Sequence, residues 1–341
     1  FEQHYQADVC GNDPNDQRSM PLAELVGSVD ILLFCTPTRT TASLVEHCIH
    51  LARGREQGAL WMDITSIKLA PVTSMLNSQA EVVGMHPMCA APTSLDMRGK
   101  VLVVDKARLS KWQTWLEIFL QKLRAECILC DAQTHDQCMA YVQGVVHANQ
   151  LAQELTQTSL FADETLWALR SPSFALTQAI VGRMRCSNPR IYEDIQFDNP
   201  YVLTALQAQR DELSRMIQWI QSGEDTDRSN WRERYFPSND STCSHRQRTH
   251  HLFEHLANLV ADCSEPNDIS IRLLHDNPGV LRKVLMAFER RQLNLRSIHS
   301  SRNVLGNVVF RLGLDVSIQD SRVQEVLSAL AKEELIEPCE L

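Results

Sequence analysis

Residues 61–88, WMDITSIKLAPVTSMLNSQAEVVGMHPM, decide how this chain can fold. The apolar run 60–64 predicts a buried strand, Ser66 lies in the polar turn that follows, and a short amphipathic helix comes next. A second apolar strand, 81–85, leads directly into His86. Parallel strands joined by a helix place their carboxyl ends at one edge of a sheet, where such sheets bind ligands. Ser66 and His86 are therefore the candidate reactive groups.

The same alternation of strand and helix extends over residues 1–130. Apolar runs at 7–10, 30–35 and 101–104 predict further strands, and a turn followed by a helix comes after the second of these runs. This order is typical of a parallel α/β sheet with helices on both faces. We therefore predict a doubly wound, Rossmann-like nucleotide-binding domain.

One expected part of such a domain has no counterpart in the sequence. A dinucleotide-binding domain begins with a strand, the motif G-x-G-x-x-G and a helix, because the glycines let backbone N–H groups approach a pyrophosphate. The 341 residues contain no such motif. The opening residues FEQHYQADV read as the end of that first helix followed by the second strand. We expect the first βα unit to be missing from this sequence; the alternative is a domain that lacks it and binds its cofactor poorly.

Two turns at strand ends are the candidate cofactor-binding residues. Asp13 follows the strand predicted at 7–10, where a carboxylate would accept hydrogen bonds from ribose hydroxyls and favour NAD over NADP. The alternative is a turn residue ahead of Pro14. Thr36, Pro37 and Thr38 follow another strand and would lie against the ribose and nicotinamide, or form an ordinary turn with a threonine cap.

Beyond residue 130 the pattern changes twice. Residues 131–262 contain long runs of helix-forming residues with few turn signals before about residue 222, and predict an all-α domain. Residues 266–341 predict a small βαββα domain after a linker. Its expected elements are strands at 268–274, 293–301 and 307–316, a first helix that residues 275–281 open and that runs to about residue 291, and a second helix at 321–333. In the first turn of this domain, Asn277, Gly279 and Val280 would direct backbone N–H groups toward a carboxylate.

Several ordered blocks resemble the prephenate dehydrogenase family. They are DITSIK at 63–68, VVGMHPM at 82–88, THDQCMAYVQGVVH at 134–147, SPSF at 171–174, VGR at 181–183 and NPRIYEDI at 188–195. Together they span about the first two-thirds of the chain. The C-terminal pattern, with DNPGVL at 276–281, resembles the ACT regulatory domain.

The resemblance implies an enzyme of tyrosine biosynthesis. It would be a homodimer that oxidatively decarboxylates prephenate to 4-hydroxyphenylpyruvate with NAD as hydride acceptor. An aromatic amino acid, tyrosine or phenylalanine, would regulate it through the ACT domain. Ala175 stands where some members have a second arginine, so an arogenate dehydrogenase is an alternative. The absent glycine motif keeps a catalytically silent amino-acid sensor as another.

The resemblance also assigns roles at the reaction centre. His86 matches the catalytic histidine, and a neutral imidazole is suited to accept a hydroxyl proton at pH 7. Its alternative is a strand-end histidine satisfied by a backbone partner. Ser66 matches a serine that hydrogen-bonds this histidine and the substrate hydroxyl, and could also be a helix N-cap. Lys68 is expected to be a solvated surface residue.

The helical domain is expected to hold the substrate. Arg183 matches a carboxylate-binding arginine, and bidentate pairing suits arginine to that role; a surface salt bridge is its alternative. Tyr192 matches an aromatic residue beside this contact, and His147 matches a histidine close to the substrate. His135 is expected to hold the local structure by pairing with Asp136.

Composition excludes several classes of function. The net charge of −9 and the absence of a basic block argue against nucleic acid and anionic membranes as partners. No apolar run is long enough to span a bilayer, and no secretory leader is recognisable. The 11 cysteines are scattered and odd in number, which favours reduced thiols in the cytoplasm. Cys127 and Cys130 have no second C-x-x-C pair, so no metal site is predicted.

Overall fold

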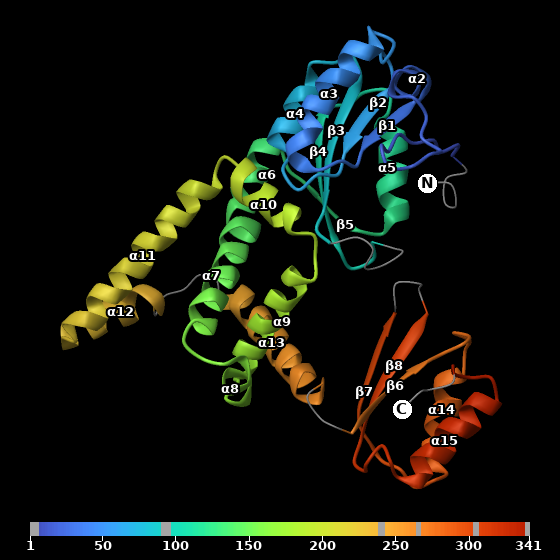
Figure 1. Cartoon of the computed structure of the whole chain (residues 1–341), viewed down its shortest axis with the longest axis vertical. Coiled ribbons are helices and arrows are strands. Elements are labelled where there is room, and N and C mark those ends of the chain that lie inside the picture. The colour runs from blue at the N-terminus through green and yellow to red at the C-terminus, as the bar shows by residue number, and fades with distance from the viewer. Residues whose placement is uncertain (1–6, 90–96, 238–242, 264–266, 303–306, 338–341) are drawn as a thin grey trace. The chain divides into compact units, whose positions relative to one another are not determined.

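The computed structural model describes residues 7–89, 97–237, 243–263, 267–302 and 307–337 (Figure 1). The chain divides into two compact units. The first contains the described residues 7–89, 97–160 and 181–237, and the second contains 161–180 and the described residues beyond 242. No helix in the described ranges is long and apolar enough to cross a lipid bilayer.

A five-stranded sheet is the centre of the first unit, with the spatial order β1-β2-β3-β4-β5 (Figure 1). The strands are β1 (Ile31–Phe34), β2 (Leu60–Asp63), β3 (Glu81–Pro87), β4 (Val101–Arg108) and β5 (Glu126–Leu129). The first three are parallel to one another, β4 is antiparallel to β3, and β5 is parallel to β4. The α/β prediction is confirmed, but the sheet is mixed rather than parallel throughout.

Two sequence predictions about this sheet are wrong. The strand at 101–104 runs antiparallel to its neighbour, because only residues 88–100 connect it to β3 and an antiparallel pair needs no crossover helix. Residues 7–10 form no strand. Most of them are exposed, and a strand is not stable without a partner strand beside it.

Helices cover both faces of the sheet: α2 (Leu22–Ser28), α3 (Thr38–Ala52) and α4 (Leu69–Leu76) on one side and α5 (Gln113–Leu123) on the other. Successive side chains of β2 point to opposite faces of the sheet, so each face has its own core against the helices that cover it. Trp61 packs into the core cluster that contains the α3 residue Val45, whereas Leu60 and Met62 pack into the cluster that contains the α5 residue Leu116. A strand buried on both faces reads as a continuous apolar run, which is how β2 was recognised.

The rest of the first unit is helical: α6 (Ala132–Met139), the π-helix η1 (Ala140–Val145), α7 (Val146–Thr158), α10 (Pro189–Asp198), α11 (Val202–Ser222) and α12 (Asp225–Tyr235). α6, η1 and α7 follow one another without a break. A Cβ atom at Gly144 would lie 2.5 Å from Val202 Cγ2, so this glycine allows α11 to pack closely against η1. That contact fixes η1, the segment that faces the candidate site.

The second unit contains α8 (Asp163–Ala168), the first part of α9 (Pro172–Arg185), α13 (Cys243–Cys263) and a small α/β assembly. The assembly comprises β6 (Asp268–Arg272), α14 (Val280–Glu289), β7 (Leu295–Arg302), β8 (Val308–Leu314) and α15 (Ser321–Lys332). Its strands form an antiparallel sheet in the order β6-β8-β7, and apolar residues of both helices pack into one core with the strands. The predicted βαββα order is confirmed.

Candidate active site

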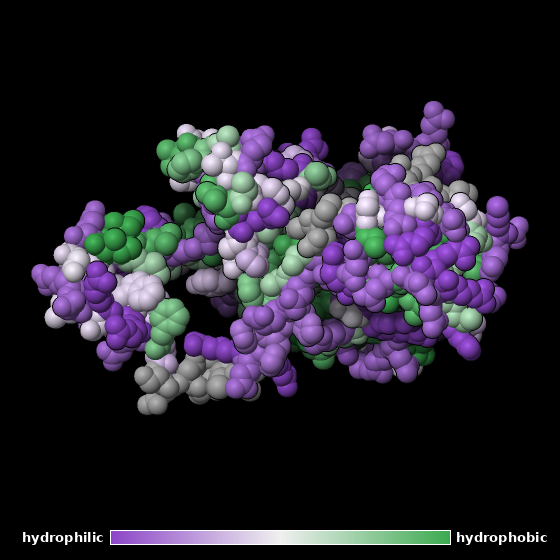
Figure 2. All heavy atoms as spheres, turned by 90° about the horizontal axis from the view of Figure 1, so that it is seen from below, coloured by the Kyte–Doolittle hydropathy of each residue, from purple (hydrophilic) through white to green (hydrophobic). Residues whose placement is uncertain are grey.

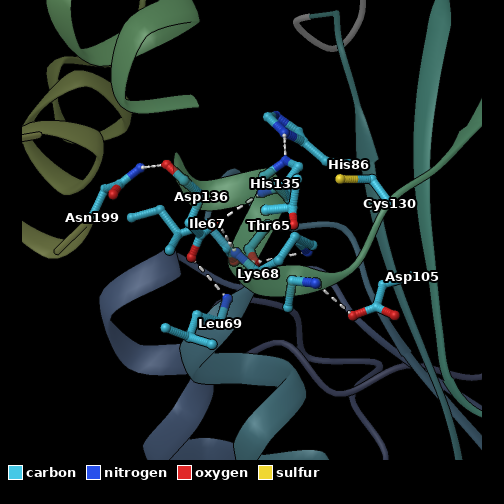
Figure 3. Close-up of polar contacts among 12 residues, drawn as sticks. Thr65, Ile67, Lys68, Leu69, His86, Asp105, Cys130, His135, Asp136 and Asn199 are labelled. Carbon is cyan, nitrogen blue, oxygen red and sulfur yellow. Dashed lines mark hydrogen bonds and ion pairs between the residues drawn. The ribbon is translucent and has the colours of Figure 1, made fainter. Parts of the chain in front are cut away.

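His86 lies near the carboxyl end of β3 and is only 3% exposed. Its Nδ1 atom is 2.9 Å from Nε2 of His135, which comes from α6 (Figure 3). Burial lowers the pKa of His86 well below its ordinary value of 6.5, and the nearby His135 and Lys68 lower it further. At neutral pH the imidazole is therefore uncharged and able to accept a proton.

His135 is held in turn by Asp136. The distance from His135 Nδ1 to Asp136 Oδ1 is 2.7 Å, which confirms the predicted pair. The Asp136 carboxylate also accepts the backbone N–H groups of Lys68 and Leu69, each at 2.8 Å. It therefore caps the amino end of α4, whose own N-cap residue, Lys68, makes no side-chain cap. Sequence reasoning missed the contact with His86, because no local pattern links a strand end to a helix 49 residues further on.

Lys68 is not a solvated surface residue, so that prediction is wrong. Its side chain is 1% exposed and forms an ion pair with the buried Asp63. The Lys68 ammonium also donates to Thr65 Oγ1 at 3.2 Å (Figure 3). It donates to the carbonyl of Met85 at 2.7 Å as well. Burial lowers the pKa of Lys68, against the opposing effect of the Asp63 carboxylate. The lysine is buried because the carboxylate at the end of β2 is itself buried and needs a cation.

Ser66 lies in the turn between β2 and α4 and is partly buried. α4 begins at Leu69 with Lys68 at the N-cap, so the alternative reading of Ser66 as the N-cap is wrong. The described structure contains no hydrogen bond between Ser66 and His86, and His135 is the residue that orients the His86 ring. A contact between Ser66 and a substrate hydroxyl stays a prediction.

A row of polar side chains leads from His86 along η1 and α7. Gln143 Nε2 lies 3.5 Å from His86 Nε2. Four residues further on, His147 meets Tyr192 of α10 edge to face, with ring centroids 4.9 Å apart. Burial, and then the charge of Arg183, lower the pKa of His147. The structure thus brings His86, His147, Tyr192 and Arg183 into one neighbourhood, with Gln143 as a member that the sequence had not identified.

Two polar atoms in this row are buried without a partner. They are Gln143 Oε1 and His147 Nδ1, neither of which is hydrogen-bonded within the described part of the chain. A buried polar group that lacks a hydrogen bond costs about 1–3 kcal/mol, so such groups mark positions where a ligand or ordered water belongs. π-helical turns such as η1 also occur frequently at functional sites.

Arg183 is exposed on α9, and no carboxylate among the described residues pairs with its guanidinium. Its neighbour Arg185 instead forms the surface salt bridge, to Glu154 at 2.7 Å. The salt-bridge alternative therefore applies to Arg185 and not to Arg183. A free guanidinium near His147 is suited to bind a carboxylate.

The predicted nucleotide-binding residues lie in turns. The Asp13 carboxylate is exposed and accepts the backbone N–H of Asn15 at 2.8 Å, an Asx turn. At the carboxyl end of β1, Thr36 Oγ1 lies 2.8 Å from Thr41 Oγ1, Pro37 is the N-cap of α3, and Thr38 is its first residue. Because β1 and β3 are both parallel to β2, this turn lies at the same sheet edge as His86. The carboxyl edge is where sheets of this kind bind their ligands, and binding by these residues stays a prediction.

Comparison with known proteins bears on this site. The family model for the prephenate dehydrogenase nucleotide-binding domain matches residues 6–96, and the model for the dimerization domain of the same family matches residues 131–233. Neither match extends into the C-terminal βαββα assembly. The first matched range contains His86, and the second contains the other residues of the site, His135, Gln143, His147, Arg183 and Tyr192.

Individual relatives agree with the models. A probable arogenate/prephenate dehydrogenase of Methanocaldococcus jannaschii is 31% identical over 179 residues, which are 51% of this chain and 40% of that protein. The T-protein of Haemophilus influenzae is 25% identical over 212 residues, 61% of this chain and 55% of that protein. The chain thus spans about half the length of these curated relatives.

A solved structure shows the same fold. The prephenate dehydrogenase of A. aeolicus, in complex with hydroxyphenyl propionate and NAD+, superposes with a TM-score of 0.54 at 18% identity. The superposition covers 68% of this chain and 88% of the other. By its nucleotide-binding and dimerization domains, the chain belongs to the prephenate dehydrogenase family.

Proposed function

We propose that this protein is an NAD-dependent dehydrogenase of tyrosine biosynthesis that oxidatively decarboxylates prephenate to 4-hydroxyphenylpyruvate. The observation that carries the proposal is His86, a buried and uncharged base at the carboxyl edge of a nucleotide-binding sheet. The matched family, the free guanidinium of Arg183 and the unpartnered polar atoms of Gln143 and His147 support it.

The reaction requires one general base and one cationic group that binds a carboxylate of the substrate. His86 accepts the proton of the ring hydroxyl as a hydride leaves the same carbon. NAD, when bound, supplies the hydride acceptor. The bond to the ring carboxylate then breaks, and its electron pair completes the aromatic ring as carbon dioxide leaves. Ser66 would donate a hydrogen bond to the hydroxyl oxygen, and Arg183 would hold a carboxylate of the substrate. Aromatisation drives the loss of carbon dioxide, so no strong acid is required from the protein.

Arg183→Ala tests whether Arg183 binds a carboxylate of the substrate. We expect the KM for substrate to rise on the order of 10- to 100-fold, with kcat changed much less, because a charge-assisted hydrogen bond contributes roughly 1.5–3 kcal/mol. Steady-state kinetics at saturating NAD measures both constants. The matched control is Arg185→Ala, two residues away on the same helix, an exposed arginine that is already paired with Glu154. Equal effects of the two substitutions would contradict the assignment.

The identity of the substrate can be decided by one assay on the natural full-length protein. The values of kcat/KM are compared for prephenate and for arogenate, whose products are 4-hydroxyphenylpyruvate and tyrosine. A higher value for prephenate supports the proposal, whereas a higher value for arogenate would replace prephenate by its amino-acid relative within the same reaction class. Turnover of neither compound would leave the catalytically silent sensor.

We further propose that the protein is a homodimer formed through its helical domain. α11 carries an exposed apolar stripe of Leu213, Ile217 and Ile220, with exposures of 49%, 54% and 73%. Green patches of hydrophobic surface lie among purple ones at the left of Figure 2, the side on which Figure 1 places α11 and α12. The matched dimerization model spans this helix, and a stripe of this kind is typical of a surface that a partner covers.

Ile217→Lys tests this surface. We expect the dimer dissociation constant to rise on the order of 100-fold or more, because an unpaired ammonium would be buried in an apolar contact. Sedimentation velocity over a concentration series measures the change. Gln218→Lys, one position along on a different face of α11, should leave the dimer intact. An unchanged dissociation constant for Ile217→Lys would exclude the stripe as the interface.

The C-terminal assembly is proposed to be a ferredoxin-like ACT domain. Beyond the three-stranded sheet, Leu273 and Ile336 form an antiparallel bridge, and Glu337 N–H donates to the carbonyl of Arg272. Residues 335–337 thus lie along the other edge of β6, and the order becomes that of a four-stranded ferredoxin-like sheet. Gly279, at φ +92°, is the N-cap of α14, where a left-handed backbone conformation favours glycine.

An aromatic amino acid is the proposed effector, bound near Asn277, Gly279 and Val280. We expect saturating tyrosine or phenylalanine to raise the melting temperature, by about 2–4 °C for each kcal/mol of binding free energy. Differential scanning fluorimetry measures the shift, and removal of residues 266–341 should abolish it. No shift with either amino acid would contradict the proposal.

A further inference from the structure

We propose that His135 and Asp136 set the protonation of His86, holding its Nε2 free to accept the substrate proton and then taking up the resulting positive charge. The proposal rests on the proposed dehydrogenase function and deepens it. The three side chains form a continuous hydrogen-bonded chain, with distances of 2.9 Å between the rings and 2.7 Å from His135 to the carboxylate (Figure 3).

The carboxylate fixes the direction of every hydrogen bond in this chain. An ionised Asp136 can only accept, so Nδ1 of His135 carries the proton that it donates. A neutral imidazole has one N–H, so His135 Nε2 is an acceptor. Nδ1 of His86 must then donate to it. His86 Nε2 is left with a free lone pair, the state that a general base requires.

Gln143 agrees with this assignment. Its Nε2 is the atom on the side of His86 Nε2, at 3.5 Å, while its Oε1 is the buried atom without a partner. An amide N–H next to a bare imidazole nitrogen is compatible, whereas an N–H on that nitrogen would confront another donor. At 3.5 Å the amide N–H is a weak partner for this nitrogen, and a substrate hydroxyl would replace it there.

The neighbouring charges explain why the proton should move on. Both rings are buried, but His86 lies near the Lys68 ammonium, whereas His135 lies against the Asp136 carboxylate, so the positive charge is more favourable on His135. When Nε2 accepts the hydroxyl proton, the Nδ1 proton can pass to His135 Nε2, and the charge then lies on His135 beside the Asp136 carboxylate. Bonds balance in this step, because each ring gains one proton and His86 gives one up. His86 ends neutral and His135 becomes the cation.

The carboxylate is firmly anchored. Asp136 is fully buried, and its oxygens accept from Lys68 N, Leu69 N and His135 Nδ1. The Lys68 side chain reaches from there to the carbonyl of Met85, the residue that precedes His86. Lys68 therefore connects Asp136 to β3, the strand that carries His86. Such a network has the role of the aspartate in a serine protease triad, which orients a histidine and selects its tautomer.

The first experiment reads the tautomers directly in the unmodified protein. Long-range ¹H–¹⁵N correlation spectra of the ¹⁵N-histidine-labelled full-length protein distinguish the two ring nitrogens, and loss of a signal in His86→Asn or His135→Gln assigns it. We expect both rings to carry their proton on Nδ1. A proton on Nε2 of His86 would overturn the proposal, whatever the enzyme's activity, so this readout is independent of the proposed function.

The second experiment is Asp136→Asn. With its amide nitrogen in place of Oδ1, the asparagine would give up the hydrogen bond from the Lys68 N–H and donate to His135 Nδ1, which would reverse both hydrogen bonds and place the proton of His86 on Nε2. We expect kcat to fall on the order of 10²- to 10⁴-fold with KM nearly unchanged, as for a wrong tautomer in a triad. The His86 signal should change to the Nε2–H form in the same sample. A purely structural role would alter KM and stability without changing the tautomer.

Asp131→Asn is the matched control, since Asp131 is an exposed carboxylate on the same helix that caps α6 through Thr134. It should keep its activity within about twofold, as expected for a surface substitution. If the wild type is active and Asp136→Asn is equally active, the proposed role of His135 and Asp136 is overturned, and the dehydrogenase proposal stays intact. An inactive wild type with the expected tautomers would overturn the proposed function and leave the hydrogen-bond assignment standing.

Discussion

His86→Asn is expected to lower kcat about 10²- to 10⁴-fold, the range in which a positioned general base contributes. Asparagine can still hydrogen-bond His135, but it has no lone pair basic enough to take the proton of an alcohol. Affinity for NAD should stay within about twofold, because a substitution at the base removes a transition-state interaction and not a ground-state contact. Stopped-flow kinetics and nucleotide titration measure the two quantities.

His47→Asn is the control for this substitution, since His47 is exposed on α3. It should leave both kcat and nucleotide affinity unchanged. If His86→Asn retained near-normal turnover, the base would have to be sought elsewhere. A loss of nucleotide binding that parallels the loss of kcat would show that His86 acts through the shape of the sheet edge.

Lys68→Met is expected to lower the free energy of unfolding of the first unit by about 3–5 kcal/mol, because it leaves the Asp63 carboxylate buried without its cation. The substitution also removes the hydrogen bonds from the ammonium to Thr65 and to the Met85 carbonyl. Urea titration followed by tryptophan fluorescence measures the change, since Trp61 lies in the adjoining core. Failure of the variant to fold would be the extreme form of the same result.

Two comparisons interpret that measurement. Lys106→Met alters a lysine on β4 that makes no described ion pair, and should change stability by less than about 0.5 kcal/mol. The double variant Asp63→Leu/Lys68→Met removes both charges, and should recover much of the loss, because an apolar pair avoids desolvation of the ions. Stability of Lys68→Met equal to that of the wild type would mean that the ion pair contributes nothing.

Much of the fold could be predicted from local pattern. The strands around residues 60–64 and 81–87 are continuous apolar runs, and the C-terminal βαββα order follows from alternation and from the turn at Gly279. These signals lie within a few residues of one another. The direction of β4 is different in kind, because it depends on how the chain returns after β3, and an apolar run does not record the orientation of a strand.

The candidate site also depends on contacts between distant elements, which local sequence patterns do not show. His86 was identified from its place after a strand, and Arg183, His147 and Tyr192 from their blocks, and the structure brings them near one another. The sequence does not reveal the burial of Lys68, because a lysine in a polar turn is ordinarily solvated. Its burial depends on Asp63, which a sequence shows only as the last residue of a strand. The hydrogen bond between His135 and His86 joins elements from two different domains, and no sequence spacing predicts a contact between residues so far apart.

The stoichiometry of the reaction is the most direct test of the proposed oxidative decarboxylation. The natural full-length protein is incubated with prephenate and NAD, and NADH, carbon dioxide and 4-hydroxyphenylpyruvate are measured in the same sample. The wild type should form all three in equimolar amounts, and His86→Asn should lose all three in parallel. Absence of NADH with both prephenate and arogenate, from a folded protein, would contradict the proposal.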